Sequence, residues 1–168
     1  MTRAHLPALG YLYVALALPA LILTPKHLDT ATALYTGAIF AFLWFIASLC
    51  ARLVRFDPDG FFASVVVLGS AAFVALQARV LFAPDPHIVA PSAACAATVI
   101  IGSSLAAWRA RKIPKWFGQA GIVGGVAVLV VGLVEAAADW TFAGHAVFAS
   151  SLGFMVWVVV TSTYLLKR

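Results

Sequence analysis

Residues 115–138, KWFGQAGIVGGVAVLVVGLVEAAA, decide the fold class of this chain. No charged side chain stands between Lys115 and Glu135, and glycine, valine and leucine fill most of the positions between them. About 20 apolar residues in helical form cross the hydrocarbon layer of a bilayer. The stretch is therefore long enough and apolar enough to form a membrane-spanning helix.

Other stretches of the chain have the same character. We expect the spans to cover residues 7–24, 31–54, 60–83, 90–108, 115–138 and 145–166. Of the 168 residues, 64% are hydrophobic and only 10% are charged, and the mean hydropathy is +1.03. Soluble domains are about half apolar and about a quarter charged, so the surplus apolar side chains must face lipid. The sequence predicts an all-α membrane protein, with residues 1–168 forming a single domain of six transmembrane helices.

Turn-forming residues mark the expected ends of the spans. Pro25 follows the first span, and Asp57-Pro58-Asp59-Gly60 combines turn formers with residues that start helices. Pro19 lies inside the first span and predicts a kink there. Residues 21–26, LILTPK, contain no small-residue cleavage site, so we expect the first span to be retained.

Lysine and arginine gather in alternate loops. Only Lys26 and Arg79 fall on the side that is poor in positive charge. The residues of the rich side are Arg3, Arg52, Arg55, Arg109, Arg111, Lys112, Lys115, Lys167 and Arg168. Cytoplasmic loops carry the excess of positive charge, so we expect both termini in the cytoplasm and a multi-pass protein of the cytoplasmic (inner) membrane. The net charge of +5 thus reflects topology, and we expect no nucleic-acid partner.

Metal and cofactor chemistry find little support in the sequence. No two histidines are spaced to share a helix face, and none lies deep in a span, so we expect neither a metal site nor a haem. The histidines are His5, His27, His87 and His145. Cys50 and Cys95 fall at opposite depths and predict no disulfide. We therefore expect no cofactor.

Two charged residues fall inside the expected spans, Arg79 in the third and Glu135 in the fifth. The turns that precede these spans share the pattern R-x-x-P-x-x-F, beginning at Arg55 and at Arg111, and this alignment puts Arg79 and Glu135 at one depth near the outer surface. Charges within a span usually face the bundle interior and find a partner. We expect an ion pair, with three interpretations open: both side chains reach the outer headgroups, the pair fixes helix register, or it belongs to a ligand or catalytic site.

Small residues share a helix face with Glu135. At about 100° per residue, the residues near that face are Gly121, Gly124, Val128, Gly132 and Asp139. Small side chains let membrane helices approach closely, and Gly121-x-x-x-Gly125 supports the same interpretation. We expect this face to be buried, and Gly124→Leu or Gly132→Leu to force helices apart.

The last third of the chain resembles a known kind of protein. Residues 111–118, RKIPKWFG, are followed by a Gly/Val-rich helix and by a final span that ends YLLKR at residues 164–168. This pattern is similar to that of small Ala/Val-rich bacterial integral membrane proteins of unknown function. The resemblance implies a bacterial cytoplasmic membrane protein and implies no activity.

Three classes of function remain open. The first is a protein that binds a small amphipathic or lipid-like ligand in a pocket open to the outer leaflet. The residues expected to line that pocket are Arg79, Gln77, Glu135, Asp139, Trp140 and His145. The second is a membrane enzyme of the isomerase or cyclase type, with Glu135 or Asp139 as general acid or base towards a lipid or isoprenoid. The third is an accessory subunit that packs against larger membrane proteins, or against further copies of itself.

Overall fold

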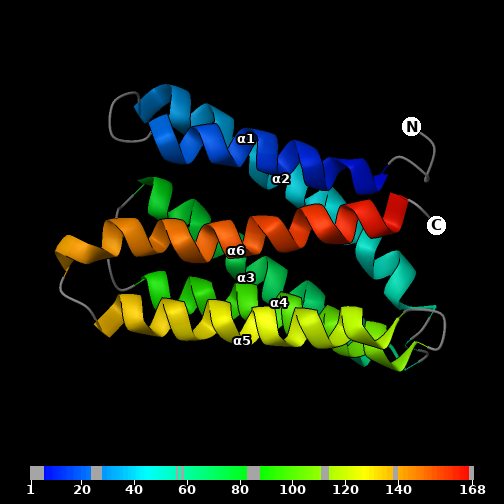
Figure 1. Cartoon of the computed structure of the whole chain (residues 1–168). Helices are drawn as coiled ribbons and strands as arrows, with labels where there is room; N and C mark the ends of the chain where they lie inside the picture. The colour runs from blue at the N-terminus through cyan, green and yellow to red at the C-terminus, as the bar shows by residue number, and fades with distance from the viewer. Residues whose placement is uncertain are drawn as a thin grey trace. The chain divides into compact units, whose positions relative to one another are not determined.

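The computed structural model is all-helical wherever it has regular structure (Figure 1). It describes residues 6–23, 28–55, 57, 59–82, 88–110, 114–137 and 140–166, and only the backbone for residues 6, 28, 80–82, 89 and 140–149. The α-helices in this part of the chain are α1 (Leu9–Leu23, after a 3-10 turn at Leu6–Ala8), α2 (Leu28–Leu53), α3 (Phe61–Phe82), α4 (Val89–Arg109), α5 (Lys115–Ala137) and α6 (Trp140–Leu166).

Four stretches within the described helices are long and apolar enough to cross a membrane. They are Asp29–Leu53, Phe61–Arg79, Ala90–Arg109 and Lys115–Ala137. The apolar stretches Leu9–Leu23 and Ser150–Leu166 are shorter, within the residues that could be searched. The predicted all-α class is confirmed, and each expected span overlaps one helix. That all six helices cross the membrane, and that both termini are cytoplasmic, stay predictions.

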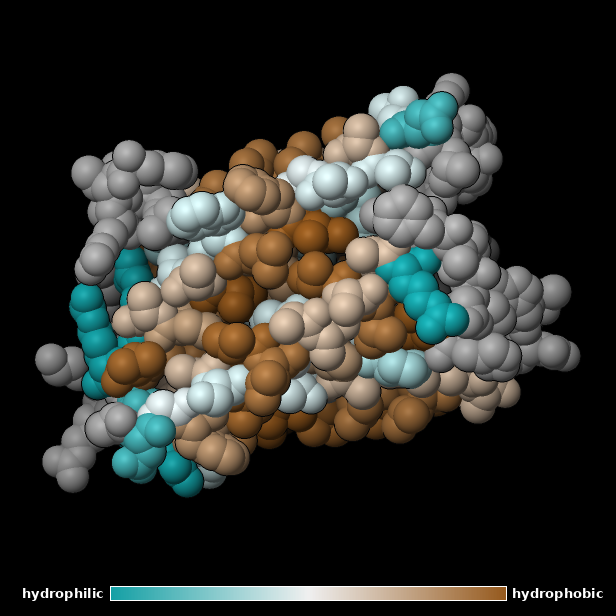
Figure 2. Space-filling view, turned by 180° about the vertical axis from the view of Figure 1, so that it is seen from behind, coloured by the Kyte–Doolittle hydropathy of each residue, from teal (hydrophilic) through white to brown (hydrophobic). Residues whose placement is uncertain are grey.

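The outer surface of these helices is apolar. Leu68 in α3 is 70% exposed and Val123 in α5 is 69% exposed. Figure 2 shows that apolar side chains cover much of the described surface on the face it presents. Water-soluble proteins rarely expose large continuous apolar patches, whereas such a surface suits contact with lipid. Both α3 and α5, which are among the four helices long enough to cross a membrane, thus also have a surface suited to lipid.

Contacts divide the chain into two compact units. Unit 1 comprises Met1–Leu49 and Val158–Arg168, and unit 2 comprises Cys50–Trp157. Both boundaries fall inside helices, so α2 and α6 each contribute residues to both units. The prediction of a single domain over residues 1–168 stays a prediction.

Unit 1 joins residues from the two ends of the sequence. The Tyr11 hydroxyl lies 2.6 Å from Oγ1 of Thr163, whose own proton is donated to the Val159 carbonyl, so Tyr11 is the donor. Next to it, Gly10 lies so close to α6 that an added Cβ would collide with Oγ of Ser162. A glycine and a hydrogen bond therefore hold α1 against the end of α6.

In unit 2, α3 and α4 pack as antiparallel neighbours. A Cβ added to Gly69 would lie 3.2 Å from Val99, and one added to Gly102 would lie 3.1 Å from Val65. Later residues of α3 thus face earlier residues of α4, so the two helices run antiparallel. Small residues set the short distance between these helices, as is usual in membrane bundles.

Helix α5 packs along α4 through a row of glycines. Gly118 faces Trp108, Gly121 faces Ser104, Gly125 faces Ile101 and Gly132 faces Ala93. An added Cβ at any of these four positions would be closer than 3 Å to an atom of α4. The Gly121-x-x-x-Gly125 interpretation is therefore confirmed, and this row places α5 antiparallel to α4.

Gly124 does not belong to that row. A Cβ added there would meet no atom within 4 Å, whereas one added to Gly132 would collide with the Cβ of Ala93. The expectation that Gly124 lies against another helix is wrong, and the same expectation for Gly132 is confirmed. The reason is geometric: the contact face of α5 is centred nearer Gly125 and Gly132, and Gly124 falls beyond its edge.

The turn before α3 is built by Asp57 and Gly60. Oδ2 of the buried Asp57 accepts hydrogen bonds from the backbone N–H groups of Phe62 at 2.6 Å and Ala63 at 3.3 Å. Gly60 has a φ of 68°, a backbone angle that residues other than glycine rarely adopt. The first N–H groups of a helix lack partners within it, and the Asp57 carboxylate satisfies two of them. The predicted helix-starting turn is confirmed.

A candidate site around the buried carboxyl of Glu135

Glu135 lies in the last turn of α5 and is only 2% exposed. The local sequence explains this burial. Gly132, three residues earlier, brings α5 into contact with Ala93 of α4, and positions three apart share a helix face. The close contact at Gly132 therefore draws the side chain of Glu135 inward, away from lipid.

The two oxygens of the Glu135 carboxyl have different surroundings. Oε2 accepts a hydrogen bond of 3.3 Å from the hydroxyl of Ser150 on α6. Oε1 is buried and has no hydrogen-bond partner among the described residues. A carboxylate can accept about four hydrogen bonds, and a buried acceptor without a partner costs about 1–3 kcal/mol. Oε1 is thus a buried acceptor that a donor group could satisfy.

The packing of α4 places Arg79 and Glu135 at the same end of unit 2. Gly69 contacts Val99, so counting forward along α3 and backward along α4 puts Arg79 level with the start of α4. Gly132 contacts Ala93, so the same count along α5 and α4 puts Glu135 level with that first turn of α4. The Arg79 side chain is exposed and the Glu135 side chain is buried. Their similar depth agrees with the sequence alignment, and the ion pair between them stays a prediction.

The other predicted ligand residues are only partly described. Gln77 is half-buried on α3, near Arg79 but on a different helix face. Asp139 lies outside the described residues. Trp140 and His145 belong to the first turns of α6, where the structure describes the backbone alone. Of the predicted set, the structure therefore brings Gln77, Arg79 and Glu135 to one end of unit 2.

Two serines at the Glu135 end of unit 2 were absent from the predicted set. Ser150 binds the carboxyl directly. Ser92 is buried next to Ala93, and its hydroxyl has no hydrogen-bond partner among the described atoms. Their signal in the sequence was weak, because serine is common in membrane helices and often bonds to its own backbone.

No family model, curated protein or solved structure matches the chain. Its own residues therefore define its class: the part of the chain that the structure describes is all-helical, with four helices long and apolar enough to cross a membrane and a buried carboxyl near the end of one of them. Within the described residues, no group of three or more His, Cys, Asp or Glu side chains is placed to hold a metal ion.

Proposed function

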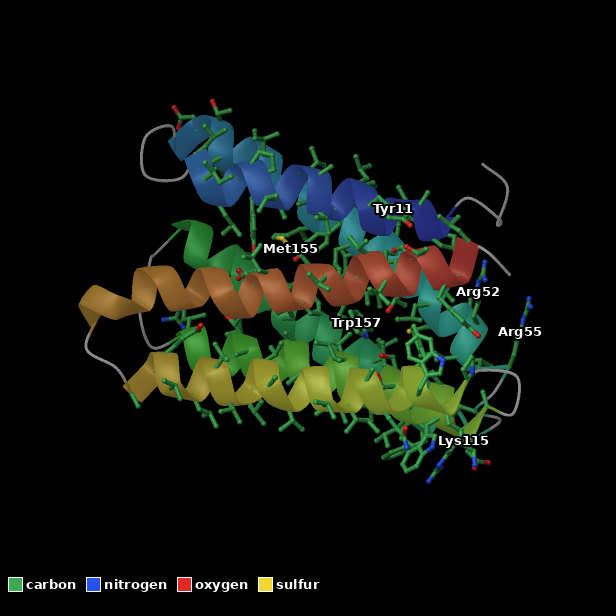
Figure 3. All side chains as sticks on the ribbon, in the orientation of Figure 1. Tyr11, Arg52, Arg55, Lys115, Met155 and Trp157 are labelled. Atoms are coloured by element: carbon green, nitrogen blue, oxygen red, sulfur yellow. The ribbon has the colours of Figure 1, made fainter. Side chains whose placement is uncertain are left out.

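We propose that the chain is a multi-pass protein of the bacterial cytoplasmic (inner) membrane, with six spans and both termini in the cytoplasm. The alternation of positive charge along the sequence supports this topology. The placement of basic side chains adds support: Figure 3 shows Arg52, Arg55 and Lys115 of unit 2 towards the same end of the view. Glu135 lies at the opposite end of α5 and would face the outer leaflet.

Cysteine labelling tests this topology. In a chain whose native Cys50 and Cys95 are replaced by alanine, Asp59→Cys and Lys112→Cys should stay unlabelled by an impermeant thiol reagent in intact cells. His87→Cys, in the third loop, should react under the same conditions and serves as the matched control. Labelling of Asp59→Cys or Lys112→Cys from outside would contradict the six-span topology, provided that the cells remain sealed.

We further propose that the protein binds a small amphipathic or lipid-like ligand, with Glu135 as its polar anchor. The observation that carries this proposal is the buried Oε1 atom, which has no hydrogen-bond partner among the described residues. Ionisable residues inside a membrane span are costly to bury and usually functional. A hydroxyl or amine on the ligand head would donate to Oε1, and its apolar part would lie among the surrounding aliphatic side chains.

The remaining predicted residues would complete the pocket. Arg79, level with Glu135, would meet an anionic or carbonyl group of the ligand, and Gln77 would add a neutral donor and acceptor. Asp139 would stand at the mouth of the pocket, since it follows Glu135 by about one helical turn. Trp140 and His145 would border the same opening from the start of α6.

Glu135→Gln tests the anchor. The amide keeps the size of the side chain and can still accept a hydrogen bond from Ser150, but it presents an NH₂ donor or a weaker acceptor to the ligand. Loss of a hydrogen bond to a charged group costs about 1.5–3 kcal/mol, so we expect co-purifying ligand to fall by about tenfold or more. The measurement is the lipid content of purified protein by mass spectrometry. The control is Ser70→Ala, which changes another buried polar side chain of unit 2.

The outcomes separate the three classes of function. Retention of the ligand by Glu135→Gln would contradict the anchor. An enzyme that uses Glu135 as general acid or base would keep its substrate and lose turnover in this variant. An accessory subunit would retain the same lipids and change only its assembly with partner proteins.

A further inference from the structure

The end of unit 2 opposite to Glu135 gathers basic side chains from several helix ends. Arg52 lies in the last turn of α2, Arg109 ends α4 and Lys115 begins α5. Of the two acids in the turn before α3, Asp57 is buried and bonded to backbone N–H groups, and Asp59 is exposed. The described charges at this end are therefore mostly positive.

Close packing brings two of these charges to neighbouring helix ends. A Cβ added to Gly118 would lie 2.7 Å from the Cβ of Trp108 and 2.9 Å from the Ser104 carbonyl oxygen, so the α5 backbone rests directly on α4. Arg109 follows Trp108 on α4, and Lys115 precedes Gly118 by one turn on α5. We call this surface, made of Arg109, Lys115 and the exposed indoles of Trp108 and Trp116, the basic seam.

Aromatic side chains flank the basic seam. Trp108 is 44% exposed and Trp116 is 64% exposed. Tryptophan is enriched where membrane proteins meet the lipid headgroups, because its ring is apolar and its N–H group is polar. The two indoles therefore place the seam at headgroup level, next to the phosphates.

Arg109 is held in place before any ligand arrives. Its guanidinium carbon lies 4.8 Å from the centroid of the Phe62 ring, within the range of a cation–π interaction. Phe62 is itself buried, and its backbone N–H is bonded to Asp57. A side chain that is already ordered loses less entropy on binding, and the planar guanidinium matches the oxygens of a phosphate group.

We propose that the basic seam binds the phosphate headgroup of an anionic phospholipid. Arg109 and Lys115 contact the phosphate oxygens from two adjacent helices. Trp108 and Trp116 pack against the glycerol and upper acyl region of the same lipid. The anionic surface of the cytoplasmic leaflet attracts basic groups close to the membrane, which agrees with the topology proposed above. This site is separate from the Glu135 site and does not depend on it.

The test compares nanodiscs of phosphatidylcholine with nanodiscs that also contain phosphatidylglycerol. We expect the anionic lipid to raise the unfolding midpoint of the wild-type protein. This rise should disappear in the double variant Arg109→Gln/Lys115→Gln. It should persist in Arg55→Gln, which removes the same kind of charge at this end of unit 2, outside the seam.

Three results of the unfolding experiment would overturn the proposal. One is an equal midpoint for the wild type in both bilayers. Another is a rise that persists in Arg109→Gln/Lys115→Gln. The third is an equal loss in Arg55→Gln, because the protein would then respond to diffuse charge. Native mass spectrometry of the wild type from an equimolar mixture of the two lipids needs no variant, so it covers the case in which the double variant does not fold. Preferential retention of phosphatidylglycerol supports the seam, and equal retention of both lipids overturns it.

Discussion

Gly132→Leu is expected to lower the unfolding midpoint of the purified protein sharply, whereas Gly124→Leu leaves it close to that of the wild type. A single added Cβ at Gly132 already collides with the Cβ of Ala93, and a leucine adds three more carbons at the same place. Overpacking of this kind typically costs about 1–3 kcal/mol and sometimes more. The Cβ of Ala93 is attached directly to the α4 backbone and has no rotatable side chain beyond it, so it cannot move aside to relieve the collision.

Gly124→Leu is the matched control, because it makes the same chemical change on the same helix. A Cβ at Gly124 meets no atom within 4 Å. Leucine also favours the helix by almost 1 kcal/mol over glycine, so the control should be neutral or slightly stabilising. The unfolding midpoints of both variants are measured by heating the protein in detergent and monitoring the folded fraction by size-exclusion chromatography. Equal midpoints would contradict the contact between α5 and α4 at Gly132.

Asp57→Ala is expected to destabilise the start of α3. The change leaves the N–H groups of Phe62 and Ala63 without the carboxylate that accepts them at 2.6 Å and 3.3 Å. Hydrogen bonds to charged groups contribute about 1.5–3 kcal/mol, and loss of a helix-capping residue costs about 0.5–2 kcal/mol, so we expect a loss of about 2 kcal/mol. The measurement is the free energy of unfolding from a reversible denaturant titration in mixed micelles.

Two companion variants make this result specific to the cap. Asp57→Asn keeps one acceptor oxygen and should recover most of the lost stability. Asp59→Ala removes the same charge from an exposed position two residues away and should change the free energy of unfolding by less than about 0.5 kcal/mol. If Asp59→Ala were as damaging as Asp57→Ala, the loss would come from charge in the loop and not from the cap.

Helix positions could be predicted from the sequence because their ends carry chemical signals. The turn at Asp57–Gly60 and the basic residues around Lys115 fixed the starts of α3 and α5 closely. The start of α6 was placed too late: it begins at Trp140, whereas the apolar span was expected from residue 145. Hydropathy finds the part of a helix that fits the hydrocarbon layer, and a helix can continue beyond that layer.

The inward faces of the helices were harder to predict. Helix α5 is apolar on all sides, so no polar stripe separates its buried face from its lipid face. Gly124 and Gly125 are adjacent and chemically identical, yet only Gly125 touches α4. Which of them makes contact depends on the rotation of the helix, and that rotation is set by the packing of the whole unit.

The candidate site shows the same division. The inward position of Glu135 followed from the cost of exposing a carboxyl to lipid, which depends on this residue alone. Its hydrogen bond with Ser150 could not be predicted, because it depends on how α5 and α6 are aligned. The energetics of a single residue were thus enough to predict that Glu135 faces inward, whereas its hydrogen-bond partner depended on the packing between helices.

The composition of unit 1 has a consequence for biosynthesis. Its residues come from Met1–Leu49 and from Val158–Arg168, whereas unit 2 is one consecutive segment. During translation, Gly10 and Tyr11 have neither Ser162 nor Thr163 to contact until the residues after Val158 have been made. That side of α1 therefore lacks its contacts with α6 until the end of the chain has been made. A stop codon at Val158 would therefore leave unit 2 with all of its residues and unit 1 permanently unfinished.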